Sequence, residues 1–154
     1  MNMIEQAKEI SVIKPRAGAS ITSKYVSLKH CKEAYIFVHI NQANAATVAI
    51  TVEEAKDKDG DDSQAIANNT EIWVNQDTDT SDAMVRQDDG KAFTTSAATK
   101  TKLVAFRIDP ARISEGFTHV CVKTAASNAA NITSAHVVLT GLKYKQAIPP
   151  TDIT

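Results

Sequence analysis

The chain has 154 residues, a net charge of −1 and 43% hydrophobic residues, with few aromatics. A chain of this length is expected to form one domain and to bury a core without a metal or a disulfide. The near-neutral charge gives no sign of nucleic-acid binding, and no stretch approaches the ~20 apolar residues of a membrane span. Cys31 and Cys121 are far apart in the sequence and are expected to be buried free thiols.

Residues 1–24 are expected to form an arm that precedes the folded domain. Lysine and arginine outnumber acidic residues there, and Pro15 and Gly18 interrupt any helix. The segment has too little apolar surface to pack alone, so it is expected to become ordered only on a partner. The residues expected to contact that partner are Lys8, Ile10, Val12, Ile13, Lys14 and Arg16.

The segments that follow alternate apolar and polar residues with a period of two, which predicts strands with one buried face. The predicted strands are 34–40, 47–54, 70–75, 83–86, 102–109, 117–124 and 132–144. Polar turns separate them, and Asp109 followed by Pro110 predicts one helical turn.

The number of short strands and the lack of a long helix predict an all-β fold, an antiparallel β-sandwich similar to a jelly roll. The sandwich is expected over residues 25–145, with a C-terminal tail over 146–154 because Pro149 and Pro150 cannot extend a ladder. The residues expected in its core are Ile36, Val38, Val48, Ile50, Val104, Phe106, Val120, Val122, Val137 and Leu139.

The tripeptide Asn-Ala-Ala occurs twice, each time between two strand-like segments. An asparagine followed by two alanines suits a hairpin turn of four or five residues, so two similar hairpins are predicted. Small tips also let another backbone approach closely, so a contact between subunits is one explanation of the repeat and a chance repeat of common residues is the other. The residues in this predicted contact are Asn44, Ala45, Ala46, Asn128, Ala129 and Ala130.

No catalytic, cofactor-binding or metal-binding residue is predicted. The acidic segment 57–62 (DKDGDD) lacks the glycine and glutamate spacing of a calcium loop, which favours a solvated loop over a weak divalent site. His119 and Cys121 share one strand face, but such neighbours lie about 6–7 Å apart, too far for a nucleophile and its base. The chain is therefore not expected to be an enzyme.

Four long phrases resemble a family of small proteins encoded beside the major capsid gene of tailed bacteriophages and prophages. They are FVHINQANAATVAITVEEA, IWVNQDTDTSDAMVRQDDGKAFTTSAATK, FRIDPARI and VKTAASNAANITSAHVVLTGLKYKQAIPP. The similarity covers roughly residues 34–150. It implies a virion structural protein, a head decoration (cement) protein that is assembled in the host cytoplasm and lies on the capsid surface.

The resemblance implies the major capsid protein as partner, and the three-fold sites of capsid lattices favour a homotrimer. The basic segment 1–24 is expected to lie on the capsid and the acidic stretch 53–91 to face outward. The competing hypothesis is a tail or fibre module that recognises a host-surface glycan through Trp73 and the loop 75–82. No nucleic acid, membrane or cofactor is expected as a partner under either hypothesis.

Overall fold

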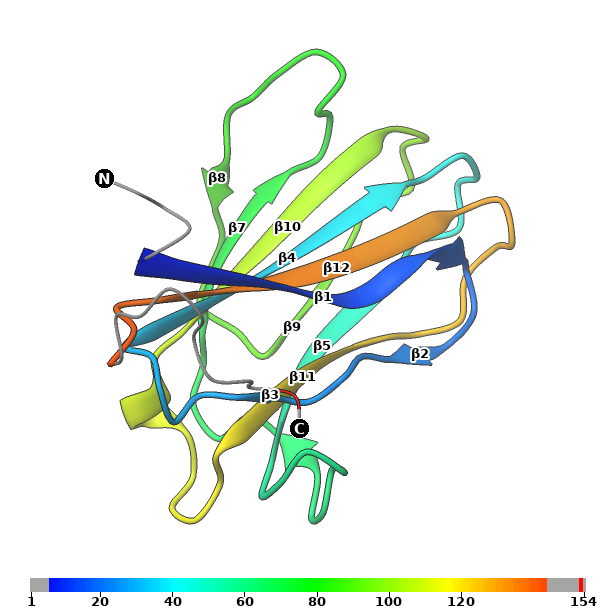
Figure 1. The fold of residues 1–154 in the computed structure, drawn as a ribbon. Helices are drawn as coiled ribbons and strands as arrows, with labels where there is room; N and C mark the ends of the chain where they lie inside the picture. Colours follow the sequence, from blue (N-terminus) through cyan, green and yellow to red (C-terminus); the bar gives the residue numbers. More distant parts are fainter. Residues whose placement is uncertain (1–5, 144–152, 154) are drawn as a thin grey trace.

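The computed structural model describes residues 6–143 and residue 153. Two antiparallel sheets pack face to face as a β-sandwich (Figure 1), which confirms the predicted all-β class. Sheet A has the strand order β1 (Ala7–Ala17), β12 (Ile132–Thr140), β4 (Glu33–Asn41), β10 (Thr101–Ile108), β7 (Glu71–Asn75) and β8 (Val85–Arg86). Sheet B is built on β11 (His119–Thr124) and β5 (Ala49–Ala55), with the short strands β2 (Ile21–Thr22), β3 (Val26–Ser27), β6 (Gln64–Ala65) and β9 (Ala92–Thr94) at its edges.

The core lies between the two sheets and consists mainly of branched aliphatic side chains. All ten residues predicted for the core are buried in one cluster, which confirms that part of the prediction. Each such side chain contributes about 1.5–3 kcal/mol when it leaves water. The alternation that placed these residues inward also places their sequence neighbours on the outer face of each sheet.

The N-terminal segment belongs to the sandwich, so the expectation of an arm over residues 1–24 is wrong from residue 7 onward. β1 pairs with β12 along its length, and Ile10, Val12 and Ile13 are buried in the core. The register shifts between Ser11 and Ile13. This irregularity allows two consecutive side chains to point inward and breaks the alternation on which the prediction relied. Residues 1–5 lie outside the described residues.

The two Asn-Ala-Ala segments are not hairpins. The first joins β4 of sheet A to β5 of sheet B, and the second joins β11 of sheet B to β12 of sheet A. Both are therefore crossings from one sheet to the other. The hairpin prediction was wrong because the alternation of apolar and polar residues shows where strands begin and end. It does not show which sheet each strand joins.

The remaining boundaries differ only locally. The last strand ends at Thr140, before Gly141 with a φ of 60°, a left-handed conformation that favours glycine. The predicted helical turn is present as a 3₁₀ turn, η1 (Pro110–Arg112), and the Asp109 side chain caps it. The predicted tail 146–154 lies outside the described residues apart from Ile153, which packs against the core. Within the described ranges no helix is long and apolar enough to cross a membrane.

Candidate functional site

The outer face of sheet A combines aromatic, apolar and charged side chains. On β10, Val104 and Phe106 point into the core, so Ala105 and Arg107 between them point outward. The same alternation applies to the neighbouring strands. The outer face of sheet A consists of Glu33, Tyr35, Phe37 and His39 on β4, Leu103, Ala105 and Arg107 on β10, Ser134, His136 and Val138 on β12, and Glu71 and Trp73 on β7.

A row of rings crosses this face at right angles to the strands. The register aligns Trp73, Ala105, Phe37 and His136 on four neighbouring strands. The rings of Phe37 and His136 stack with their centroids 5.2 Å apart. At the other end, the Arg86 guanidinium lies over the Trp73 ring, 5.4 Å from its centroid, in a cation–π contact. We call Trp73, Phe37 and His136 the aromatic row.

Ala105 is the small residue within the row, between Trp73 and Phe37. It is only 6% exposed although it points outward, because larger neighbours cover it. Trp73, in contrast, is 37% exposed, a large value for this side chain. The row therefore presents the tryptophan ring to solvent on a rigid sheet rather than on a loop.

A chain of ion pairs runs beside the aromatic row. Arg107 donates to Glu33 and, at 2.7 Å, to Glu71, and Arg86 lies 3.4 Å from Glu71 and also pairs with Asp89. The hydrogen bond from Arg107 lowers the pKa of the Glu33 carboxyl, and the two carboxylates raise the pKa of Arg107. We call these five residues the ion ladder. Exposed pairs of this kind add little stability, so their main effect is to fix the orientation of the long side chains.

A pair of histidines lies at the far end of the face. The His39 and His136 rings stack at 5.2 Å, and the His136 Nε2 atom lies 3.9 Å from a Glu9 carboxylate oxygen. Desolvation, with a smaller contribution from His136, lowers the pKa of His39. The neutral form of His39 is therefore favoured.

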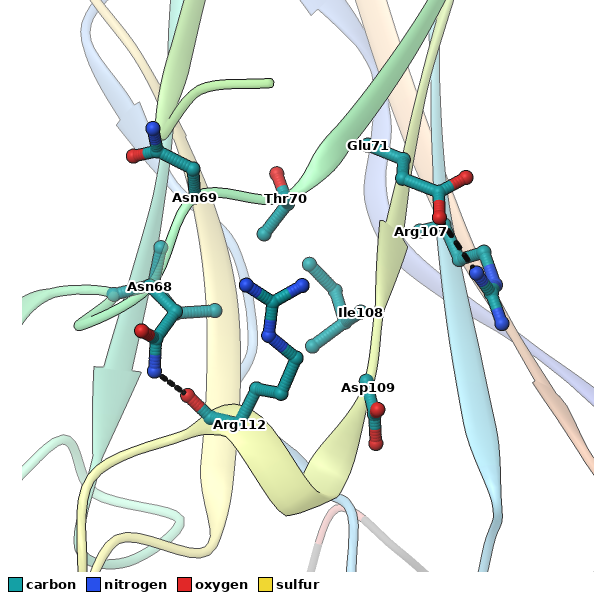
Figure 2. A pocket seen from close by; sticks show the side chains of 9 residues that line it. Asn68, Asn69, Thr70, Glu71, Arg107, Ile108, Asp109 and Arg112 are labelled. Atoms are coloured by element: carbon teal, nitrogen blue, oxygen red, sulfur yellow. Dashed lines mark hydrogen bonds and ion pairs between the residues drawn. The ribbon is translucent and has the colours of Figure 1, made fainter.

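A small polar cavity opens beside η1, at the end of sheet A (Figure 2). Its volume is about 50 Å³, and Glu71 and Arg107 of the ion ladder line one side of it. Asn68, Asn69 and Thr70 lie on the segment that leads into β7, and Arg112 reaches in from η1. The side chains of Glu71 and Arg107 lie on the other side of β7 and β10 from Arg112 (Figure 2), so the cavity opens at the end of the sandwich, next to η1, and not on the outer face of sheet A.

Of the residues predicted to contact the capsid, three are removed from that role by the structure. Ile10, Val12 and Ile13 are buried in the core and cannot contact a partner directly. Lys14 and Arg16 are exposed on β1, the edge strand of sheet A, and Lys8 is half-buried. Ile10, Val12 and Ile13 are buried because they form the inward face of β1, which packs against the rest of the sandwich.

The predicted subunit-contact residues come together within one chain. The Asn131 side chain links the two crossings, since its Oδ1 accepts the Asn44 N–H at 2.8 Å and its Nδ2 donates to the Ala46 carbonyl at 2.8 Å. Gly18 packs so closely on the Asn128 carbonyl that a Cβ there would lie 2.3 Å from its oxygen. The close backbone approach that small residues allow is therefore made within this chain. Ala45, Ala129 and Ala130 remain exposed, and their contact with another subunit stays a prediction.

The acidic loop 57–62 uses its carboxylates internally. Asp57 Oδ1 accepts the N–H groups of Asp59 and Asp61, and Lys56 pairs with Asp62 at 2.5 Å. In the part of the chain that the structure describes, no group of three or more His, Cys, Asp or Glu side chains could hold a metal ion. Burial raises the pKa of the Cys121 thiol to about 11, so it carries no thiolate at neutral pH.

Sequence reasoning identified Trp73 but did not identify the surface around it. The outward positions of Tyr35, Phe37 and His39 follow from the alternation of β4, yet their neighbours on β10 and β12 are fixed only by strand order. The one usable signal was the concentration of rings on the side of β4 that faces away from the core. Such a side is polar in most solvated sheets.

Comparisons with known proteins show the fold. No family model matches the sequence, and no curated protein matches it. Among solved structures, the SPBc2 prophage-derived protein YomS matches with a TM-score of 0.51 and 13% identity, over 87% of this chain and 93% of that chain. The CBM22-1–GH10 modules of Clostridium thermocellum xylanase 10B match with a TM-score of 0.39 and 7% identity, over 95% of this chain and 28% of that one. The chain thus shares the fold of a prophage-derived protein.

Proposed function

We propose that this chain is a structural protein of a tailed-phage particle and binds the capsid shell as a decoration (cement) protein. The observation that carries the proposal is the outer face of sheet A, which presents Tyr35 and the contacting pair of Trp73 and Arg86 on one rigid sheet. Tryptophan, tyrosine and arginine are the residue types that dominate binding energy at protein interfaces. The resemblance to proteins encoded beside the major capsid gene supports that shell as the partner.

The proposed docking surface replaces the N-terminal segment as the anchor. Many copies bound to a regular shell need only a modest contact each, because avidity adds to the affinity of a single copy. The acidic loop 57–62 joins two strands of sheet B, the other layer of the sandwich. An orientation with sheet A on the shell and the acidic loop toward solvent is part of the proposal. So is a homotrimer, in which the exposed Ala45, Ala129 and Ala130 lie at the subunit contact.

The test combines location with mutagenesis. Cryo-electron microscopy of purified particles should place the protein on the head shell, with sheet A toward it. Trp73→Ala should weaken binding of the purified protein to undecorated particles by about tenfold or more, as expected for an interface hot spot. Phe117→Ala removes a ring from a loop outside sheet A and should leave binding unchanged. Equal affinities for the two variants would contradict the proposed surface.

Glycan recognition is a second candidate function, favoured by the exposure of Trp73 on a flat face. An exposed ring offers an apolar surface for a sugar, and charged side chains of the ion ladder lie beside it. The predicted loop contributes less than expected, because Asn75 is buried and its amide donates to the Ser81 carbonyl at 2.7 Å. A glycan array would show hits that Trp73→Ala abolishes, and an array without hits would remove this candidate.

A further inference from the structure

The cavity at the end of sheet A has the size of a single functional group. Its volume of about 50 Å³ lies well below the roughly 300–1,000 Å³ of small-molecule sites. It exceeds the roughly 10–15 Å³ that one water molecule needs. A carboxylate or a few waters therefore fit, and a sugar ring or a nucleotide does not.

Arg112 places an unused guanidinium in this cavity. Figure 2 shows the side chain rising from η1 between Asn68 and Ile108 toward Thr70. Arg86 and Arg107 each bind two carboxylates. Across residues 6–143 and 153, no carboxylate forms an ion pair with Arg112. A guanidinium carries five N–H donors in a planar fork that matches the two oxygens of a carboxylate.

The backbone of Arg112 is held from both sides. Its N–H donates to the Asp109 carbonyl at 3.0 Å, and its own carbonyl accepts a hydrogen bond from the Asn68 side-chain amide (Figure 2). Pro110 fixes the first position of the turn, and the Asp109 side chain caps it by accepting the Ala111 N–H at 2.9 Å. The base of the side chain is thus preorganised, so binding through it orders less of the chain.

The acidic groups around the cavity are already engaged. Glu71 lies between Arg107 and Arg86 in the ion ladder. Asp109 caps η1, and in Figure 2 its carboxylate points away from the cavity. The Arg112 guanidinium is therefore the charged group in the cavity whose donors are available to a ligand.

We propose that this cavity receives the carboxylate of an aspartate or glutamate side chain from the protein that docks on sheet A. The inference rests on the proposed function, because Arg107 and Glu71 border the cavity and also belong to the ion ladder on the docking face. The side chains of Glu71 and Arg107 lie across the strands from Arg112 (Figure 2), so a partner on sheet A reaches the cavity where it extends past the end of the sheet toward η1. The Arg112 guanidinium then binds both oxygens of one acidic side chain. This contact fixes the position of the docked protein along sheet A.

The first experiment tests the cavity without the partner. The arginine Nε–H resonances are followed by NMR as sodium acetate is added at constant ionic strength, with sodium chloride, phosphate and glucuronate as parallel titrations. The Arg112 resonance should shift with saturation in acetate, while that of exposed Arg16 should not. Saturation with phosphate but not acetate would indicate a phosphate site instead. Identical, unsaturated shifts of both arginines would show that the cavity holds only water, and either result overturns the proposal.

The second experiment tests the partner. Arg112→Gln should weaken binding of the full chain to undecorated particles by about tenfold, since a charge-assisted hydrogen bond is lost, and Arg16→Gln should not. If acetate saturates the cavity while Arg112→Gln binds particles like wild type, the occupant is not a side chain of the shell and the proposal is wrong. If the wild-type chain fails to bind particles at all, the proposed function fails together with the named partner, and the acetate titration alone decides the chemistry of the cavity.

Discussion

Asn131 shows how one side chain can fix two distant crossings of the chain. It is fully buried, and besides its bonds to Asn44 and Ala46 it donates to Ser127 Oγ at 3.0 Å. These bonds satisfy backbone groups that would otherwise be shielded from water without a partner. The repeated Asn-Ala-Ala segments are therefore held together by a residue that follows the second repeat and has no counterpart after the first.

Replacing Asn131 is expected to cost far more stability than replacing its neighbour. Asn131→Ala removes the partner of the Asn44 N–H and leaves the Ala46 carbonyl only the longer bond from Ser127 Oγ at 3.4 Å, so it should lower the free energy of unfolding by about 2–3 kcal/mol. Asn128→Ala removes only a local bond to the exposed Ala130 N–H and should cost under about 1 kcal/mol. Urea denaturation of both variants measures the difference, and similar midpoints would show that Asn131 does not clamp the crossings.

The buried thiol of Cys121 predicts a loss of stability at alkaline pH. Its pKa is about 11 in the folded protein against 9.0 for an unperturbed thiol. Between these values the unfolded chain loses its proton while the folded chain keeps it, so stability falls as pH rises from 9 to 11. The contribution is on the order of 2 kcal/mol. Cys121→Ala should flatten the dependence of urea midpoints on pH in that window. If the urea midpoints of Cys121→Ala depended on pH as those of the wild type do, the loss of stability would come from other titrating groups.

β1 is an integral strand of the sandwich and not an arm that precedes it. Its irregular register turns Val12 and Ile13 inward together, while Lys14 points to solvent. Ile13→Asp should unfold the protein at 25 °C or lower its unfolding free energy by more than about 3 kcal/mol, because a charge would enter the core unpaired. Lys14→Asp, one position on, should change stability by less than about 0.5 kcal/mol. Circular dichroism and thermal melts of the two variants measure the difference. If both stayed equally folded, β1 would not be an integral part of the sandwich.

The alternation of apolar and polar residues predicted some strands of the sandwich and missed others. Strands such as β4 and β10 alternate without interruption, so their existence, their faces and the core residues Val38 and Phe106 followed from the pattern alone. β1 was missed because a bulge removes the alternation. The crossings were mistaken for hairpins because sheet membership depends on contacts between residues far apart in the chain. The same dependence hid the aromatic row, whose members come from β7, β4 and β12.

The pairing of charges on sheet A predicts how binding of the chain to the capsid shell responds to salt. Every charged group of the ion ladder is paired within the ladder, whose two arginines and three carboxylates leave a net charge of −1, and Trp73 and Phe37 of the aromatic row are uncharged. If sheet A docks on the shell, binding should survive 1 M salt, where the Debye length is about 3 Å, with less than about a tenfold loss of affinity. Co-sedimentation with particles at low and high salt measures this. A steep decline would favour attachment through exposed cations such as Lys14 and Arg16.

The position of β12 between β1 and β4 has a consequence for biosynthesis. Sheet A cannot close until residues 132–140 have left the ribosome, because β12 is the strand that pairs with β1 among those that the structure describes. At roughly 5–20 residues per second, the strands made earlier wait for several seconds beside an open sheet edge. During that interval the inward faces of β1 and β4 are available to chaperones or to another nascent chain. Polysomes that crowd several copies together would therefore favour exchange of β1 between neighbours, and slower translation of the last third of the message would lengthen the time available for it.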